Sequence, residues 1–138
     1  MVLENGLPGF GGANTYSPLS LAFIGDAVFE LLVRTSLLKK CNRPSGALHR
    51  ESVRRVCARA QATGYERIRS ILTEEEEAAF RRGRNASPSH SPKSASSHDY
   101  HYATGLETLF GYLYVKGDIP RLEELFDVIE RGYEEASA

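Results

Sequence analysis

The chain has 138 residues, and its 17 Lys and Arg against 18 Asp and Glu give a formal net charge of −1. Hydrophobic residues make up 41% of the sequence, which is enough to bury a core and excludes a wholly disordered chain. No stretch of about 18 uncharged apolar residues occurs, which excludes a transmembrane helix, and no signal peptide is visible at the start.

The cysteine content indicates the cellular compartment, and the net charge indicates the class of binding partner. Two cysteines, Cys41 and Cys57, are too few for a disulfide framework, so we expect a cytoplasmic protein that binds no membrane. A net charge near zero at first disfavours a nucleic-acid partner.

The first elements in chain order are a lead-in and a long helix. Residues 1–16 are Gly-rich and are expected to be flexible, ahead of a single domain at residues 17–138. Ser17 and Pro18 fit an N-cap followed by proline at the first helical position. The following residues are apolar on most sides, which predicts a central, buried helix to about Leu38.

A second helix is predicted after Pro44, with Cys57 among its inward residues. Its other face carries a stripe of arginines, namely Arg50, Arg54, Arg55 and Arg59. Gly64 is expected to break this helix before a short one. Thr73 and Glu76 form a capping box that opens the next helix, which is expected to end near Gly83.

Residues 85–97 form the longest predicted loop, because they are Ser-rich and contain Pro88 and Pro92. Helical periodicity then returns in a helix that ends at Gly117, and Pro120 opens a last helix. No stretch alternates convincingly with a period of two. The sequence therefore predicts an all-α domain with about six to seven helices.

The near-neutral net charge is a sum of segregated charges. Residues 34–69 carry ten basic side chains against two acidic ones, whereas residues 74–77 are all glutamates and residues 100–138 have a net charge of −5. Residues 81–99 are again basic. This segregation is compatible with binding to a polyanion, although solvated helix faces are the simpler interpretation.

Two carboxylates stand in apolar helices. Asp26 follows Gly25 in the most apolar predicted helix, and Glu107 lies beside small residues in another. A buried carboxylate is costly unless it is paired, hydrogen-bonded or metal-bound, and small neighbours allow a backbone or ligand to come close. The two could converge on a divalent cation such as Mg²⁺. Pairing with arginine or capping of a neighbouring helix is the alternative.

The same residues resemble those of the ribonuclease III family. Phe-Ile-Gly-Asp-Ala-Val-Phe-Glu at 23–30 resembles the signature helix of its catalytic domain, and Thr-Gly-Leu-Glu-Thr-Leu-Phe-Gly at 104–111 resembles its second acidic motif. Together with Arg-Arg-Gly-Arg-Asn-Ala at 81–86, these motifs resemble the Mini-ribonuclease III branch. That branch has a catalytic domain without a double-stranded-RNA-binding domain.

The resemblance implies an all-helical, homodimeric endonuclease that cuts duplex RNA with Mg²⁺. It places the catalytic and metal-binding roles on Asp26 and Glu107, and its expected substrate is precursor large-subunit (23S) ribosomal RNA. Ala22 and Thr104 stand where other ribonuclease III enzymes have acidic residues, as is typical of the Mini branch. With fewer protein ligands, the metal should rely more on water and RNA phosphate.

Further residues are candidates for RNA contacts and for support of the acidic pair. Duplex RNA is recognised by shape and by phosphate and 2′-OH contacts, and the candidate residues are Arg50, Arg54, Arg81, Arg84, Asn85 and Lys93. Thr104 could orient a water, or simply pack its helix. Glu30 could support the metal site from outside, or be a surface or paired carboxylate.

Two other functions stay open from the sequence. Ala22 and Thr104 suit a catalytically inactive module that keeps the fold and binds double-stranded RNA. A helical protein–protein adaptor with structural buried acids is the third possibility.

Overall fold

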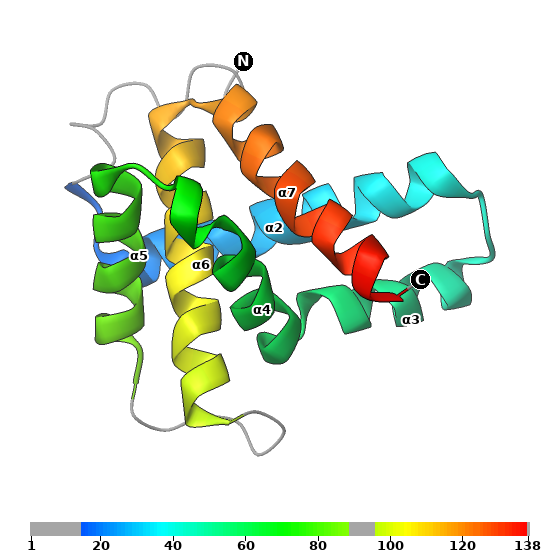
Figure 1. The fold of residues 1–138 in the computed structure, drawn as a ribbon, viewed down its shortest axis with the longest axis horizontal. Helices are drawn as coiled ribbons and strands as arrows, with labels where there is room; N and C mark the ends of the chain where they lie inside the picture. Colours follow the sequence, from blue (N-terminus) through cyan, green and yellow to red (C-terminus); the bar gives the residue numbers. More distant parts are fainter. Residues whose placement is uncertain (1–14, 89–95, 138) are drawn as a thin grey trace.

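The computed structural model describes residues 15–88 and 96–137 (Figure 1). Within these residues it has six α-helices and one short 3₁₀ helix, and it has no strand, which confirms the predicted all-α fold. The helices are α2 (Pro18–Lys40), α3 (Ser45–Val56), α4 (Ala58–Ile68), η2 (Arg69–Ile71), α5 (Glu74–Ala86), α6 (Ser97–Lys116) and α7 (Ile119–Ser137). No helix in this part of the chain is both long and apolar enough to cross a membrane.

Several helix ends lie where the sequence predicts them. The Ser17 hydroxyl accepts a hydrogen bond from the Ser20 backbone at 3.2 Å, ahead of Pro18 in the first turn of α2. The Thr73–Glu76 capping box is complete at the start of α5, with bonds of 2.9 and 3.1 Å. Gly117 ends α6 at φ 87°, a left-handed conformation that glycine adopts without strain.

Other boundaries differ from the prediction. The break after α3 lies at Cys57, whose backbone is extended and whose side chain is exposed, so Cys57 is neither helical nor a core residue. Gly64 does not break a helix; it lies inside α4, where an added Cβ would be 3.1 Å from the Ile129 side chain of α7. Tertiary packing thus keeps a glycine inside a helix that its propensity alone would weaken.

The predicted loop at 85–97 is shorter than expected at both ends. Helix α5 continues to Ala86, beyond the expected end at Gly83, and α6 begins at Ser97. Residues 89–95, including Lys93, lie outside the described residues, as do residues 1–14 of the predicted lead-in.

Helix α6 is the centre of the bundle. Figure 1 shows it between α5 and α4, with α2 crossing behind it. Its buried side chains join those of α2 and α7 in one core, where the rings of Phe29, Phe110 and Phe126 meet edge to face. Such edge-to-face contacts add to the stabilisation by buried apolar area.

The α2–α6 crossing brings two backbones into direct contact. A Cβ atom added to Gly25 of α2 would lie 1.7 Å from the carbonyl oxygen of Glu107. A Cβ atom added to Gly111 of α6 would lie 1.9 Å from the carbonyl oxygen of Leu21. Both positions therefore require glycine, and the crossing fixes the register of the two helices against each other.

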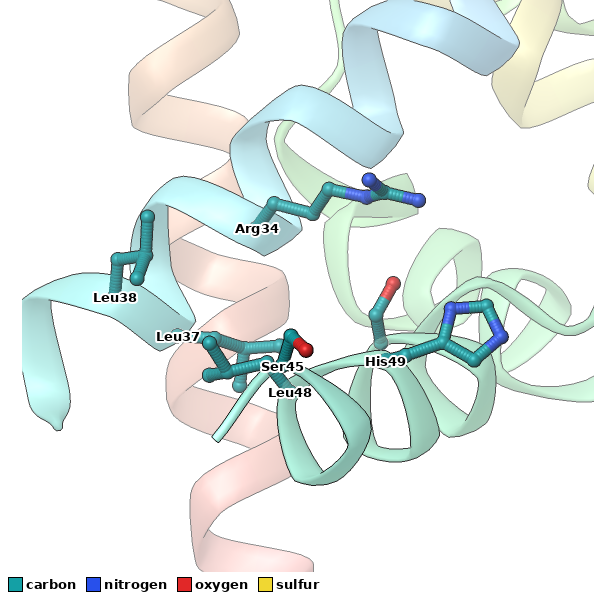
Figure 2. A pocket seen from close by; sticks show the side chains of 7 residues that line it. Arg34, Leu37, Leu38, Ser45, Leu48 and His49 are labelled. Atoms are coloured by element: carbon teal, nitrogen blue, oxygen red, sulfur yellow. The ribbon is translucent and has the colours of Figure 1, made fainter. Parts of the chain in front are cut away.

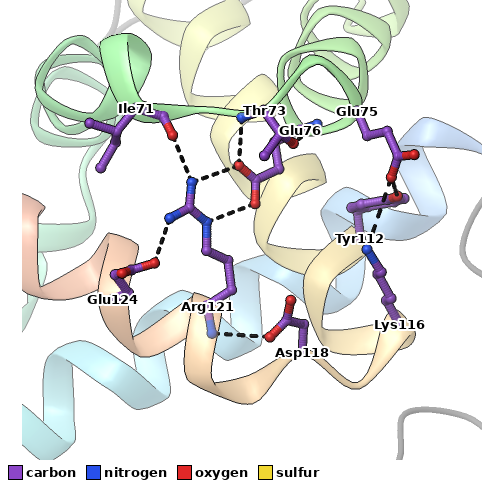
Figure 3. Close-up of polar contacts among 9 residues, drawn as sticks. All are labelled: Ile71, Thr73, Glu75, Glu76, Tyr112, Lys116, Asp118, Arg121 and Glu124. Carbon is purple, nitrogen blue, oxygen red and sulfur yellow. Dashed lines mark hydrogen bonds and ion pairs between the residues drawn. The ribbon is translucent and has the colours of Figure 1, made fainter.

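Helix α7 is tied to the start of α5 by Arg121 (Figure 3). The Arg121 guanidinium donates to both carboxylate oxygens of Glu76, at 2.8 and 2.9 Å, and to the carbonyl oxygen of Ile71 at 2.7 Å. Burial alone would raise the pKa of Glu76, but the hydrogen bonds from Arg121 and Thr73 outweigh it and lower that pKa. Glu76, one of the four glutamates at 74–77, therefore has a structural role.

The arginine stripe of α3 is not uniform. Arg55, expected on the solvated face, is only 5% exposed; it pairs with Glu130 of α7 and lies 4.3 Å from the centre of the Tyr133 ring. Burial lowers the pKa of Arg55 despite its acidic neighbours. Arg50, Arg54 and Arg59 are exposed.

We expect Gly25→Ala to destabilise the protein by about 3 kcal/mol or more, because its Cβ meets a main-chain atom that cannot rotate away. Gly46→Ala in α3 is the matched control. Its Cβ meets only the end of the flexible Arg50 side chain, at 3.5 Å, and stability should be unchanged or higher. Urea denaturation of both variants measures the effect, and equal midpoints would contradict the close crossing.

Candidate active site

The α2–α6 crossing brings Asp26 and Glu107 together. Asp26 directly follows Gly25 and is exposed, whereas Glu107 is half-buried. The two carboxyl groups are close enough to hydrogen-bond when one of them is protonated. Burial, and after it the neighbouring Asp26, raises the pKa of Glu107 to about 8. The pair that the sequence singled out is therefore a pair in space.

Among the described residues, no cationic side chain pairs with Asp26 or Glu107. None of the ion pairs found among residues 15–88 and 96–137 includes Asp26 or Glu107. The groups that shift the pKa of Glu107 are Asp26 and the amide of Gln61, and neither carries a positive charge. The alternative of arginine pairing is thus not what this part of the structure shows.

The donor set fits a hard divalent cation. Mg²⁺ is commonly held by one or two carboxylates and completes its shell with waters and substrate phosphates. Two like-charged carboxylates at an accessible position offer such a partial shell. The described residues contain no group of three or more potential ligands, so they form no closed metal cage of the kind that structural zinc requires.

The two residues predicted to support the pair are engaged elsewhere. The Thr104 hydroxyl, one turn before Glu107, donates to the Tyr100 carbonyl at 3.0 Å and accepts from the Ser87 hydroxyl at 3.3 Å. Glu30, one turn after Asp26, pairs with Arg34 at 2.9 Å. The contacts of Thr104 are those of a threonine that packs its helix, and the contact of Glu30 is that of a paired carboxylate. Both are among the alternatives given by the sequence.

The predicted RNA-binding residues fall on two helices. Arg50 and Arg54 lie on α3, where Arg54 also pairs with Glu51 at 3.3 Å. Arg81, Arg84 and Asn85 lie on the last turns of α5. Figure 1 shows α3 and α5 on opposite sides of α6, so the structure divides these residues between two flanks of the central helix.

Arg84 has the most defined surroundings of these residues. Its guanidinium carbon lies 5.9 Å from the centre of the Phe80 ring and 6.0 Å from that of Tyr102. Its Nε donates to the Asn85 side chain at 3.2 Å. These contacts hold a cation at the end of α5, next to the start of α6.

Sequence reasoning missed Gln61. This residue of α4 is only 2% exposed, and its amide acts on Glu107. Its signal was available: Gln61 shares one helix face with Tyr65 and Ile68, and a lone amide on an apolar face is unusual.

A separate cavity of about 350 Å³ lies between α2 and α3 (Figure 2). Three leucines line it, together with Arg34, Ser45, His49 and Ser52. It contains neither Asp26 nor Glu107, so this cavity is separate from the candidate pair.

Comparisons with known proteins point to one family. A family model described as the ribonuclease III domain matches residues 19–118. The Mini-ribonuclease 3 of Thermoanaerobacter sp. is 44% identical over 124 residues, 90% of this chain and 87% of its own length. That of Synechocystis sp. is 46% identical over 114 residues, 83% of this chain and 78% of its own length.

A solved structure agrees with these relatives. The crystal structure of a protein from Fusobacterium nucleatum matches with a TM-score of 0.78 and 29% identity. The match covers 86% of this chain and 94% of that one.

The raised pKa of Glu107 predicts a pH-dependent stability. Its ordinary value is 4.5 and the folded value about 8, so between these pH values the folded chain holds a proton that the unfolded chain has lost. In EDTA, the free energy of unfolding should therefore fall as pH rises across this range, with a slope of up to about 1.4 kcal/mol per pH unit. Urea titrations of wild type and Glu107→Gln check this, because the variant lacks the titrating group. Parallel pH profiles would contradict the assignment.

Proposed function

The chain belongs to the ribonuclease III family, and on this basis we propose that it is a Mg²⁺-dependent endoribonuclease that cleaves double-stranded RNA. The observation that carries the proposal is the meeting of Asp26 and Glu107 at the α2–α6 crossing, where no cationic side chain of residues 15–88 and 96–137 pairs with them. Both acids lie inside the segment that the family model matches.

Asp26 and Glu107 would hold the cation between them. A bound Mg²⁺ supplies an activated water and neutralises charge that develops on the phosphate. Glu107 would have to give up its proton to become a ligand, because burial and Asp26 raise the pKa of its carboxyl group to about 8 without metal. Asp26, which is exposed, leaves the site open to the RNA.

The basic residues on both flanks of α6 would bind the duplex. Arg50 and Arg54 of α3, and Arg81, Arg84 and Asn85 of α5 with Lys93 beyond it, are proposed to contact phosphates. Contacts of this kind position a duplex without reading its bases, and they depend on salt. Two separated groups suit a rod-shaped substrate that lies across the central helix.

An apolar strip on α2 supports a homodimer. Phe23 is 83% exposed, and Leu19, Leu31 and Leu38 on the same helix are also exposed. Large exposed apolar side chains on one helix are typical of an interface. We propose that residues 17–138 form a catalytic domain that dimerises through this strip. Sedimentation equilibrium of wild type and Phe23→Asp measures the oligomeric state of each.

The proposed natural substrate is precursor large-subunit ribosomal RNA, and the proposed location is the cytoplasm. Support comes from the family likeness alone, so trimming of a precursor transcript by the protein is the direct check. The competing proposal is an inactive double-stranded-RNA-binding module. It draws on Ala22, which adds no ligand, and on the Thr104 hydroxyl, which is bound to a main-chain carbonyl.

Asp26→Asn should abolish cleavage of a labelled RNA duplex in Mg²⁺, by a factor on the order of a hundred or more, because a ligand and its charge are lost. Wild type and Asp127→Asn, an exposed acid of α7, are the controls and should cleave equally. Salt-sensitive binding by wild type without any cleavage would favour the inactive module, and neither binding nor cleavage would favour a protein–protein adaptor.

Arg84→Ala should weaken duplex binding on the order of fivefold and reduce its dependence on salt, because one phosphate contact is lost. Arg131→Ala, which removes an exposed arginine from α7, is the matched control and should bind like wild type. Filter binding at several salt concentrations without divalent metal measures both. Unchanged affinity in Arg84→Ala would remove this residue from the RNA surface.

A further inference from the structure

Gln61 is a polar side chain in an apolar position. It is 2% exposed and lies on the face of α4 that packs against α6, one turn before Tyr65. Its Nε2 atom is buried and has no hydrogen-bond partner at full geometry. A buried amide without a hydrogen-bond partner is costly, so a leucine or methionine would serve packing better.

The amide of Gln61 faces Glu107. The Nε2 atom lies within reach of the Glu107 carboxyl group, although the geometry falls short of a full hydrogen bond. An amide N–H can only donate, so its place beside a carboxylate is chemically consistent.

We infer that Gln61 is a positioning residue, which orients the Glu107 carboxylate for a divalent cation shared with Asp26. The inference rests on the proposed function. In this role one carboxylate oxygen of Glu107 would accept a hydrogen bond from the Gln61 amide, which would leave the other oxygen free to face Asp26. A neutral donor does this without competing for the site, whereas a lysine or arginine would supply a positive charge in place of the metal.

The backbone of α4 makes Gln61 a rigid support. Its N–H donates to the Cys57 carbonyl at 3.0 Å in the first turn, directly after the chain break that sets the direction of α4. Tyr65, one turn later, stacks on the Phe80 ring with centroids 3.6 Å apart. These contacts hold in place the backbone that carries Gln61.

The test compares Gln61→Leu, which removes the donor at similar volume, with Gln61→Asn, which keeps an amide of shorter reach. Ser52→Ala is the matched control, because Ser52 is also 2% exposed with an unpartnered hydroxyl, but lines the cavity between α2 and α3. Three quantities are measured: the affinity for Mn²⁺ by calorimetry, the thermal midpoint, and kcat and KM for a labelled duplex against Mg²⁺ concentration.

In Gln61→Leu we expect Mn²⁺ affinity to fall about tenfold or more, with an unchanged or higher thermal midpoint. Cleavage should fall by a similar factor at low Mg²⁺ and recover at high Mg²⁺, with KM for the duplex unchanged. Gln61→Asn should recover part of the Mn²⁺ affinity, and Ser52→Ala should match wild type in all three measurements.

Wild-type Mn²⁺ affinity in Gln61→Leu would overturn the inference. So would a loss of affinity that accompanies a lower thermal midpoint and does not recover in Gln61→Asn. If Gln61→Leu and Gln61→Met both fail to fold, Gln61 is a structural residue and the inference is also overturned. A wild type that does not cleave, or an Asp26→Asn variant that does, defeats the proposed function. If Gln61→Leu has normal Mn²⁺ affinity and cleavage while Asp26→Asn is inactive, only the positioning role is defeated.

Discussion

The glycine contact between α2 and α6 is the constraint on which the rest of the structure depends. The backbone at Gly25 touches the carbonyl of Glu107, and this close approach brings the next residue, Asp26, near the Glu107 side chain. Gly111 closes the same crossing from the other helix. Any side chain at these positions would push the two helices apart, and with them the two acids. The close packing and the candidate site therefore both depend on the glycine contact.

The distribution of partners explains the near-neutral net charge. Glu76, Glu130 and several other acids are neutralised by specific cations, such as Arg121 and Arg55, and these pairs fasten α7 to α5 and to α3. Within the part of the chain that the structure describes, the Asp26–Glu107 pair has no such cation, which suits the proposed external one. The exposed arginines of α3 and α5 then provide charge for a polyanion on both sides of α6.

Local signals predicted well where a single residue type decides the outcome. The Ser17 and Thr73 caps and the glycine end of α6 follow from chemistry within a few residues. The errors arose where a distant element decides. Gly64 stays helical because Ile129 of α7 packs over it, and Arg55 is buried because Glu130 reaches it. Gln61 was overlooked because its importance depends on Glu107, a residue of another helix.

The sequence by itself determined that the protein is all-helical and which family it belongs to, because periodicity, caps and ordered motifs are properties of neighbouring residues. Only the tertiary structure decided that Asp26 and Glu107 share one environment, that the pKa of Glu107 rises to about 8, and that Gln61 faces it. Distance, burial and the local electric field arise when helices pack, and no single helix contains them.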